Sequence, residues 1–181
     1  MAAIPGAYQV KMAEEETLVA ELEQLGVRYI ARQAPYGVSD LRPPNLLLAD
    51  LMRQPSARVR AAVIAVLLAH PEFAPAVPAA LSRLSAPERL MLRFFYTAAC
   101  WLQEAYADRL KRLAPTHWQR LPDLFSSGLG LPTAGTPRER LTLLGGLCRR
   151  DTGAIVNWAG TYEHVARQLL HRWEIETTWK K

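Results

Sequence analysis

The sequence predicts an all-α protein, a compact bundle of six to eight helices with two buried helices at its centre. Three observations support this: apolar residues recur at helical spacing, helix-start signals precede several such segments, and no segment alternates apolar and polar residues as a strand does. The chain has 181 residues, of which 50% are hydrophobic and 22% charged, as is usual for one globular domain. We assign residues 14–181 to this domain and residues 1–13 to a flexible N-terminal tail.

The first helix is expected over residues 14–32. Three leucines at helical spacing line one side, and its glutamates lie near the N-terminal end, where the helix dipole favours negative charge. Gly26 is a position at which this helix can be interrupted. A connector rich in proline and glycine over residues 33–44 then leads to a short helix over residues 45–53.

The next helix has no polar side. Ser56 predicts its N-cap and Pro71 its far limit, and Ala61–Ala69 between them contains no polar side chain. A helix on the surface of a core needs polar residues on one side, so a helix without them must be covered all round. We expect this helix to be the first of the two central ones, followed by a short helix over residues 72–84.

The second central helix is expected over residues 85–114. Ser85 and Glu88 form a capping-box signature, and Leu90–Leu102 is apolar apart from two residues. Full burial of one aliphatic side chain contributes about 1.5–3 kcal/mol. Exposing the apolar runs of both central helices would therefore cost more than the stability of a typical domain, about 5–15 kcal/mol. Either the rest of the chain or a partner must cover them.

The C-terminal third predicts three more helices. A short helix is expected over residues 115–125 and a loop over residues 126–135. The helix expected over residues 136–150 begins with a second capping-box signature, and two consecutive glycines within it lower its helix propensity. The last helix, residues 154–174, has an apolar arc that includes two tryptophans.

Residues 59–67, VRAAVIAVL, resemble one helix of a HEAT-type repeat, which implies a scaffold that binds partners. Related basic–apolar pairs begin at Arg58, Arg89 and Arg140, but their separations of 31 and then 51 residues do not give one period. A stack needs at least about three repeats to bury its faces. We therefore predict that the chain is not a regular repeat array.

The strongest candidate binding region is the segment DRLKRLAPTHWQR. Its basic and aromatic side chains are Arg109, Lys111, Arg112, His117, Trp118 and Arg120. Cations beside an aromatic ring suit a nucleic-acid backbone and a stacked base, whereas the alternative is a helix end whose basic residues complement the helix dipole. The spacing of Arg112 and His117 also resembles the Arg-x4-His motif of HEPN ribonucleases, which implies RNA cleavage by these two residues. Leu113 and Pro115 depart from the pattern of that family.

A second polar group lies on the last helix, where His164, Arg167 and His171 share one stripe. Such a stripe suits a phosphate or, with a carboxylate, a metal, but its place in the middle of the polar arc favours a solvated face. We find no metal-binding motif, no phosphate-binding glycine loop and no nucleophile elbow. The sequence therefore predicts no catalytic residue, no metal and no cofactor.

Charge and cysteine usage narrow the class of protein. The net charge is +5, although residues 1–25 hold five glutamates and one lysine, so the remainder is more basic still and can attract nucleic acid or an acidic protein. Cys100 and Cys148 stand singly in apolar surroundings, which predicts buried reduced thiols in a cytoplasmic protein. We expect no signal peptide and no membrane-spanning run.

Residues 43–105 resemble small bacterial all-α proteins that accompany minimal nucleotidyltransferases, which implies a partner or regulator in a two-component module. Our leading hypothesis is a non-catalytic regulatory protein that binds another protein or a second copy of itself. The alternatives are a nucleic-acid-binding protein or HEPN-like ribonuclease that uses the Arg109–Arg120 region, and a small-molecule sensor.

Overall fold

The computed structural model describes residues 6–28, 40–153 and 158–179; for residues 6–13 and 117 it describes the backbone alone. This part of the chain forms eight α-helices and two 3-10 turns and contains no strand. In chain order the elements are α1 (Gly6–Gln24), α2 (Pro44–Arg53), α3 (Ala57–Ala69), η1 (Pro71–Ala76), α4 (Val77–Leu81), α5 (Ala86–Ala105), α6 (Ala107–Leu113), η2 (Pro115–His117), α7 (Pro137–Thr152) and α8 (Trp158–Trp179). The predicted all-α class is confirmed.

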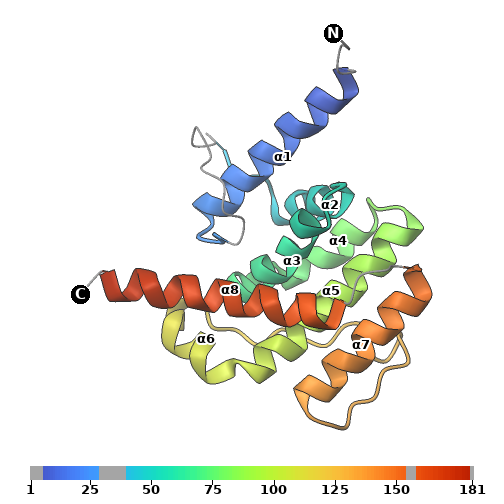
Figure 1. Cartoon of the computed structure of the whole chain (residues 1–181), viewed down its shortest axis with the longest axis vertical. Coiled ribbons are helices and arrows are strands. Elements are labelled where there is room, and N and C mark those ends of the chain that lie inside the picture. Colours follow the sequence, from blue (N-terminus) through green and yellow to red (C-terminus); the bar gives the residue numbers. More distant parts are fainter. Residues whose placement is uncertain (1–5, 29–39, 154–157, 180–181) are drawn as a thin grey trace.

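Helices α3 and α5 form the centre of the bundle, as predicted (Figure 1). α3 packs against α2, α5 and α8, and α5 packs against α3, α7 and α8. Every residue of Ala61–Ala69 is buried, and so are most residues of Leu90–Leu102. Because α3 packs on α8 from the far end of the chain, successive helices do not stack as equal repeats. The prediction that the fold is not a regular repeat array is confirmed.

The predicted helix starts are confirmed at atomic detail. The side chain of Ser56 caps α3 by accepting a hydrogen bond from the backbone N–H of Val59 at 3.4 Å. Capping boxes begin α5 and α7, where the carboxylates of Glu88 and Glu139 each accept a hydrogen bond at 2.8 Å from the backbone N–H of the N-cap residue. These caps set where α5 and α7 begin, and both helices line the pocket described below.

The ends of α1 differ from the prediction. The helix begins at Gly6, inside the segment assigned to a tail, and it ends at Gln24 rather than continuing to residue 32. Gly26 has φ of +72°, and the N–H of Val27 donates to the carbonyl of Leu22 at 2.8 Å. A residue in this left-handed conformation ends a helix, and glycine adopts it without steric cost.

The predicted helix over residues 85–114 is divided in two. α5 ends at Ala105, and the chain changes direction at Tyr106 before α6. This change of direction lets α6 pack on α8, where Arg109 donates to Glu174 at 2.8 Å. The helix predicted over residues 115–125 is wrong beyond the η2 turn: residues 118–124 have no regular structure. Side chains of α5 hold residues 118–124 in place by hydrogen bonds to backbone groups of this segment.

A partly buried ion cluster connects α1 to α2. Arg42 pairs with Glu21 of α1 and with Asp50 of α2, each at 2.9 Å. The side chain of Glu21 is 1% exposed, and burial raises the pKa of this carboxyl although Arg42 acts in the opposite direction. The N-terminal half of α1 stands clear of the other helices (Figure 1), so α1 is attached through its C-terminal half, by this cluster and by the buried side chains of Leu18 and Leu22.

Within the described part of the chain, no single helix is long and apolar enough to cross a membrane. Among the described helices, Ala57–Ala69 and Pro71–Leu81 reach that length and composition when taken together, and the chain bends by 119° between them.

Candidate functional site: the two-tryptophan pocket

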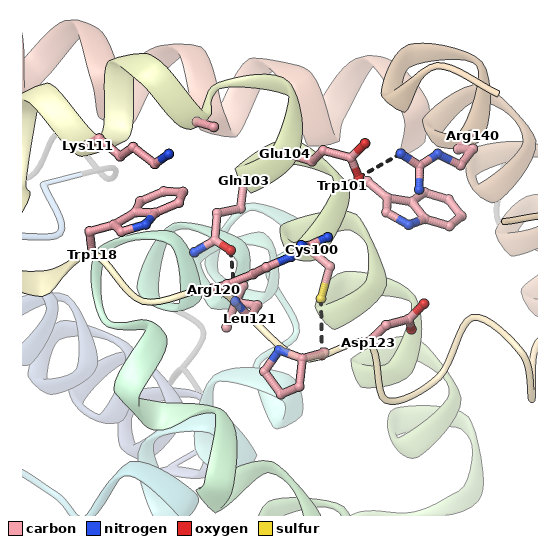
Figure 2. Close-up of a pocket in the computed structure, with 12 residues that line it drawn as sticks. Cys100, Trp101, Gln103, Glu104, Lys111, Trp118, Arg120, Leu121, Asp123 and Arg140 are labelled. Carbon is pink, nitrogen blue, oxygen red and sulfur yellow. Dashed lines mark hydrogen bonds and ion pairs between the residues drawn. The ribbon is translucent and has the colours of Figure 1, made fainter. Parts of the chain in front are cut away.

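A pocket of about 650 Å³ lies where α5, α6 and α7 meet the irregular segment that follows η2 (Figure 2). Its lining comes from the last two turns of α5, from Ala107 and Lys111 of α6, from Trp118 and residues 120–123, and from Arg140 of α7. The volume lies in the range of small-molecule binding sites, about 300–1,000 Å³. We call it the two-tryptophan pocket, after Trp101 and Trp118 on its opposite sides.

One side of the pocket is formed by Lys111 and Trp118. The ammonium of Lys111 lies 5.1 Å from the centroid of the Trp118 ring, within the range of a cation–π interaction. Arg120 appears between the two tryptophans in Figure 2 and is exposed to solvent. Among the described residues, no carboxylate pairs with Lys111 or Arg120. Both cations therefore remain available to an anion that enters the pocket.

The opposite side repeats this arrangement with Arg140 and Trp101. The guanidinium carbon of Arg140 lies 5.1 Å from the centroid of the Trp101 ring, and Nη2 pairs with Glu104 Oε2 at 2.7 Å. Arg140 is 8% exposed, whereas the side chain of Glu104 is 47% exposed. The Nε of Arg140 is buried and has no hydrogen-bond partner among the described residues.

The segment that carries Trp118 and Arg120 is fixed to α5 by buried hydrogen bonds. The side-chain amide of Gln103 donates to the carbonyl of Gln119 at 2.7 Å, and its oxygen accepts from the N–H of Leu121 at 2.8 Å. Tyr96 donates to the carbonyl of Pro122 at 2.8 Å. A stretch without helix or strand must satisfy its backbone groups elsewhere, and here the side chains of Tyr96, Cys100 and Gln103 of α5 do so. The position of Trp118 and Arg120 is thus set by α5.

Two titratable groups in the pocket wall are held in single protonation states. Burial raises the pKa of the Cys100 thiol to about 12, and the nearby charge of Asp123 acts in the same direction. At neutral pH Cys100 is therefore a thiol and not the thiolate that acts as a nucleophile. Burial also acts to raise the pKa of Asp123, but hydrogen bonds from the hydroxyl and N–H of Ser126 and the N–H of Phe125 outweigh it and lower the pKa. Asp123 is thus ionised, and its oxygens accept hydrogen bonds from its own turn.

The pocket therefore combines cationic groups with flat apolar walls. Three basic side chains line it against two carboxylates, and both carboxylates already have partners in Arg140 and the turn at Ser126. The partly exposed indole of Trp118 suits a planar group, whereas Trp101 lies beneath Arg140 and is nearly buried; lysine and arginine suit an oxyanion. The arrangement fits a small anion that carries a ring.

The structure divides the predicted Arg109–Arg120 region. Lys111, Trp118 and Arg120 are brought together at the pocket, whereas Arg109 turns to α8 and pairs with Glu174. The remaining members do not line the pocket or cannot be placed: Arg112 is exposed at the end of α6, and the side chain of His117 lies outside the described residues. RNA cleavage by Arg112 and His117 stays a prediction.

The predicted stripe on α8 lies on the surface. His164, Arg167 and His171 are all exposed, and Arg167 lies 4.0 Å from Glu163 one turn away. In the described ranges, no group of three or more His, Cys, Asp or Glu side chains is placed to hold a metal ion. Phosphate binding by this stripe remains a prediction.

Sequence reasoning missed Trp101, Glu104 and Arg140. Trp101 lies inside an apolar run and is 4% exposed, so it resembles an ordinary core residue. Trp101 and Glu104 are three residues apart, which places them on one helix face. This spacing is the only sign in the sequence that the two belong together. Nothing in the sequence relates Glu104 to Arg140, which lies on a different helix.

Comparison with known proteins gives no relative from which a function could be transferred: no family model matches the sequence, and no curated protein or solved structure is similar enough to be matched to it.

Proposed function

We propose that the protein is a non-catalytic sensor or regulator that binds a small, ring-bearing anion in the two-tryptophan pocket. The observation that carries this proposal is the pairing of a cation with an indole on both sides of one pocket, Lys111 with Trp118 and Arg140 with Trp101. The protonated state of Cys100 supports a binding role over nucleophilic catalysis.

Lys111 and Arg120 supply the attraction in this proposal. Each lacks a carboxylate partner among the described residues, and both are exposed enough to meet a ligand as it enters. A charge-assisted hydrogen bond contributes about 1.5–3 kcal/mol. Removal of both cations should therefore weaken anion binding at least about tenfold.

Isothermal titration calorimetry with adenosine monophosphate tests the proposal, with adenosine as the uncharged probe. The pocket variant is Lys111→Gln with Arg120→Gln, and the matched control is Arg138→Gln with Arg149→Gln, which removes two exposed cations of α7 that do not line the pocket. We expect saturable binding of the monophosphate by the wild type and the control, and at least about tenfold weaker binding by the pocket variant. Equal binding by both variants would refute the proposal.

The same titration with oligothymidylate distinguishes nucleic-acid binding from small-molecule binding. A single strand that follows a basic groove binds with an affinity that falls steeply with salt. Tight, strongly salt-dependent binding of the oligonucleotide with no binding of the monophosphate would favour nucleic acid over a small molecule. Arg109 already pairs with Glu174, so it contributes less to such a groove than the sequence predicts.

Self-association is a second candidate function, supported by the C-terminal end of α8. Trp179 is 86% exposed and Ile175 is 37% exposed, and they line a shallow hollow of about 340 Å³ with Arg28, Arg172 and Glu176. Exposed large apolar groups that cluster are typical of interaction surfaces. Light scattering coupled to gel filtration tests this over a range of concentrations. Trp179→Ser should reduce the apparent mass, whereas Leu143→Ser, at an exposed leucine of α7, should not. A monomer at every concentration would contradict it.

A further inference from the structure

The guanidinium of Arg140 has two donors on one edge, and only one of them has a hydrogen-bond partner among the described residues. Its Nη2 pairs with Glu104 Oε2 at 2.7 Å, while the neighbouring Nε is buried with no hydrogen-bond partner among the described residues. Nε and Nη2 are the two donors on one edge of an arginine, and together they match two oxygens of a carboxylate or phosphate. Glu104 thus uses one of the two donors on this edge, and the other is unpartnered and buried beside it.

Arg140 itself is fixed in place. It is 8% exposed, it stacks over Trp101, and it belongs to the first turns of α7 behind the Thr136 capping box. Glu104 is different, because it lies in the last turn of α5 and its side chain is 47% exposed. Of the two partners, the carboxylate can turn into solvent while the guanidinium stays.

We infer that Arg140 is the residue that binds the ligand's anionic group, and that Glu104 is a built-in competitor which that group replaces. This inference rests on the proposed function of the two-tryptophan pocket and deepens it. The ligand class is a small molecule with a carboxylate or phosphate that presents two oxygens to the Nε and Nη2 edge of Arg140. Lys111 and Arg120 attract any anion, whereas Arg140 selects one with this geometry.

The two members of the ion pair then have opposite effects on binding. Glu104→Gln removes the competing charge but keeps the shape of the side chain, so anionic probes should bind about threefold to fivefold more tightly, as expected for loss of a partly exposed ion pair. Arg140→Lys keeps the charge but loses the fork, so binding should weaken at least about tenfold. A pair with only a structural role would give neither an increase in affinity nor opposite signs.

The experiment measures affinities of matched probes for the full chain. Adenosine monophosphate and adenosine differ by a phosphate, and benzoate and benzamide differ by a carboxylate, so the two pairs separate phosphate from carboxylate recognition. Glu163→Gln is the control variant, because Glu163 also belongs to a helix-surface ion pair, with Arg167, but does not line the pocket. We expect it to leave every affinity unchanged. Tighter binding of either anion by Glu104→Gln, with loss of binding in Arg140→Lys, supports the inference.

The contrary outcomes are distinct. If the wild type binds an anion through Lys111 and Arg120 but neither Glu104→Gln nor Arg140→Lys changes the affinity, this inference is overturned and the proposed function stands. If no anion binds the wild type or any variant, both are overturned. Should Arg140→Lys fail to fold, the Nε–H resonance of Arg140 in the isotope-labelled wild type decides the question. It should shift with saturation by the anion and not by adenosine or benzamide, and an unmoved resonance at saturation overturns the inference.

Discussion

Replacing Gly145 by alanine should destabilise the protein, whereas the same replacement at the adjacent Gly146 should stabilise it. Both glycines lie inside α7, but they face different surroundings. A Cβ at Gly145 would lie 2.7 Å from the backbone nitrogen and 2.8 Å from the Cβ of Ala159 in α8. A Cβ at Gly146 would meet no atom within 4 Å. The pair isolates the close approach of α7 to α8.

The magnitude follows from two opposing effects. Alanine is favoured over glycine inside a helix by about 1 kcal/mol, and this gain applies equally to both positions. Insertion of a methyl group into a closely packed interface costs about 1–3 kcal/mol. That cost should lie in the upper part of its range at Gly145, because the nearest atom belongs to the backbone of α8 and cannot rotate away. We expect Gly146→Ala to gain about 1 kcal/mol and Gly145→Ala to lose about 1–2 kcal/mol net.

Urea denaturation followed by circular dichroism measures both variants against the wild type. The difference between the two midpoints cancels the helix-propensity gain and leaves the steric cost alone. Because an unchanged slope shows that the same surface is exposed on unfolding, the midpoints then report stability directly. If Gly145→Ala is as stable as Gly146→Ala, α7 and α8 do not approach each other as described.

Three further variants and one chemical reaction test other parts of the structure. Arg42→Met should destabilise by about 3 kcal/mol, because it leaves the buried Glu21 carboxylate without its partner. The loss should be smaller below pH 4.5, the ordinary pKa of Glu21, where the carboxyl is neutral; equal losses at acidic and neutral pH would contradict this. Because the pKa of Glu21 is raised, the folded protein holds the proton of this carboxyl more tightly than the unfolded chain does. The stabilisation that results is full below pH 4.5 and is lost as the pH rises through the raised pKa. In urea titrations, Glu21→Gln should therefore lose the least unfolding free energy relative to the wild type at neutral pH. Cys100, with a pKa of about 12 against an ordinary 9.0, should react with a disulfide reagent at mildly alkaline pH on the order of 1,000-fold more slowly than an exposed thiol, and urea should abolish the difference. Gln103→Leu should cost about 2–4 kcal/mol in thermal or urea unfolding, because it leaves two backbone groups unpaired, and a neutral result would show that the segment after η2 is held by other contacts.

Much of the fold could be predicted because it follows from local signals. Ser85 with Glu88 forms a capping box whether or not the rest of the chain is known. The run Ala61–Ala69 has to be covered on every side, since its residues are apolar all round. Prediction failed where tertiary contacts decided, as at Tyr106, where the chain changes direction so that α6 can reach α8.

The candidate site was predicted only by half for the same reason. Lys111, Trp118 and Arg120 lie close in sequence, so their cation–aromatic pattern is visible there. The other half depends on the contact of Arg140 of α7 with Trp101 and Glu104 of α5. The spacing of these residues in the sequence does not indicate this contact. The prediction also included Arg109, which pairs with Glu174 because α6 packs on α8.

The five tryptophans allow the most direct test, through the indole N–H resonances of the isotope-labelled protein during titration with adenosine monophosphate. Trp101 and Trp118 line the pocket, whereas Trp158 is buried in the core and Trp173 and Trp179 lie toward the end of α8. We predict that the resonances of Trp101 and Trp118 shift together with one saturation curve while those of the other three stay in place. Saturable shifts confined to Trp173 and Trp179, or no saturable shift at any tryptophan, would contradict an anion-binding site between α5, α6 and α7.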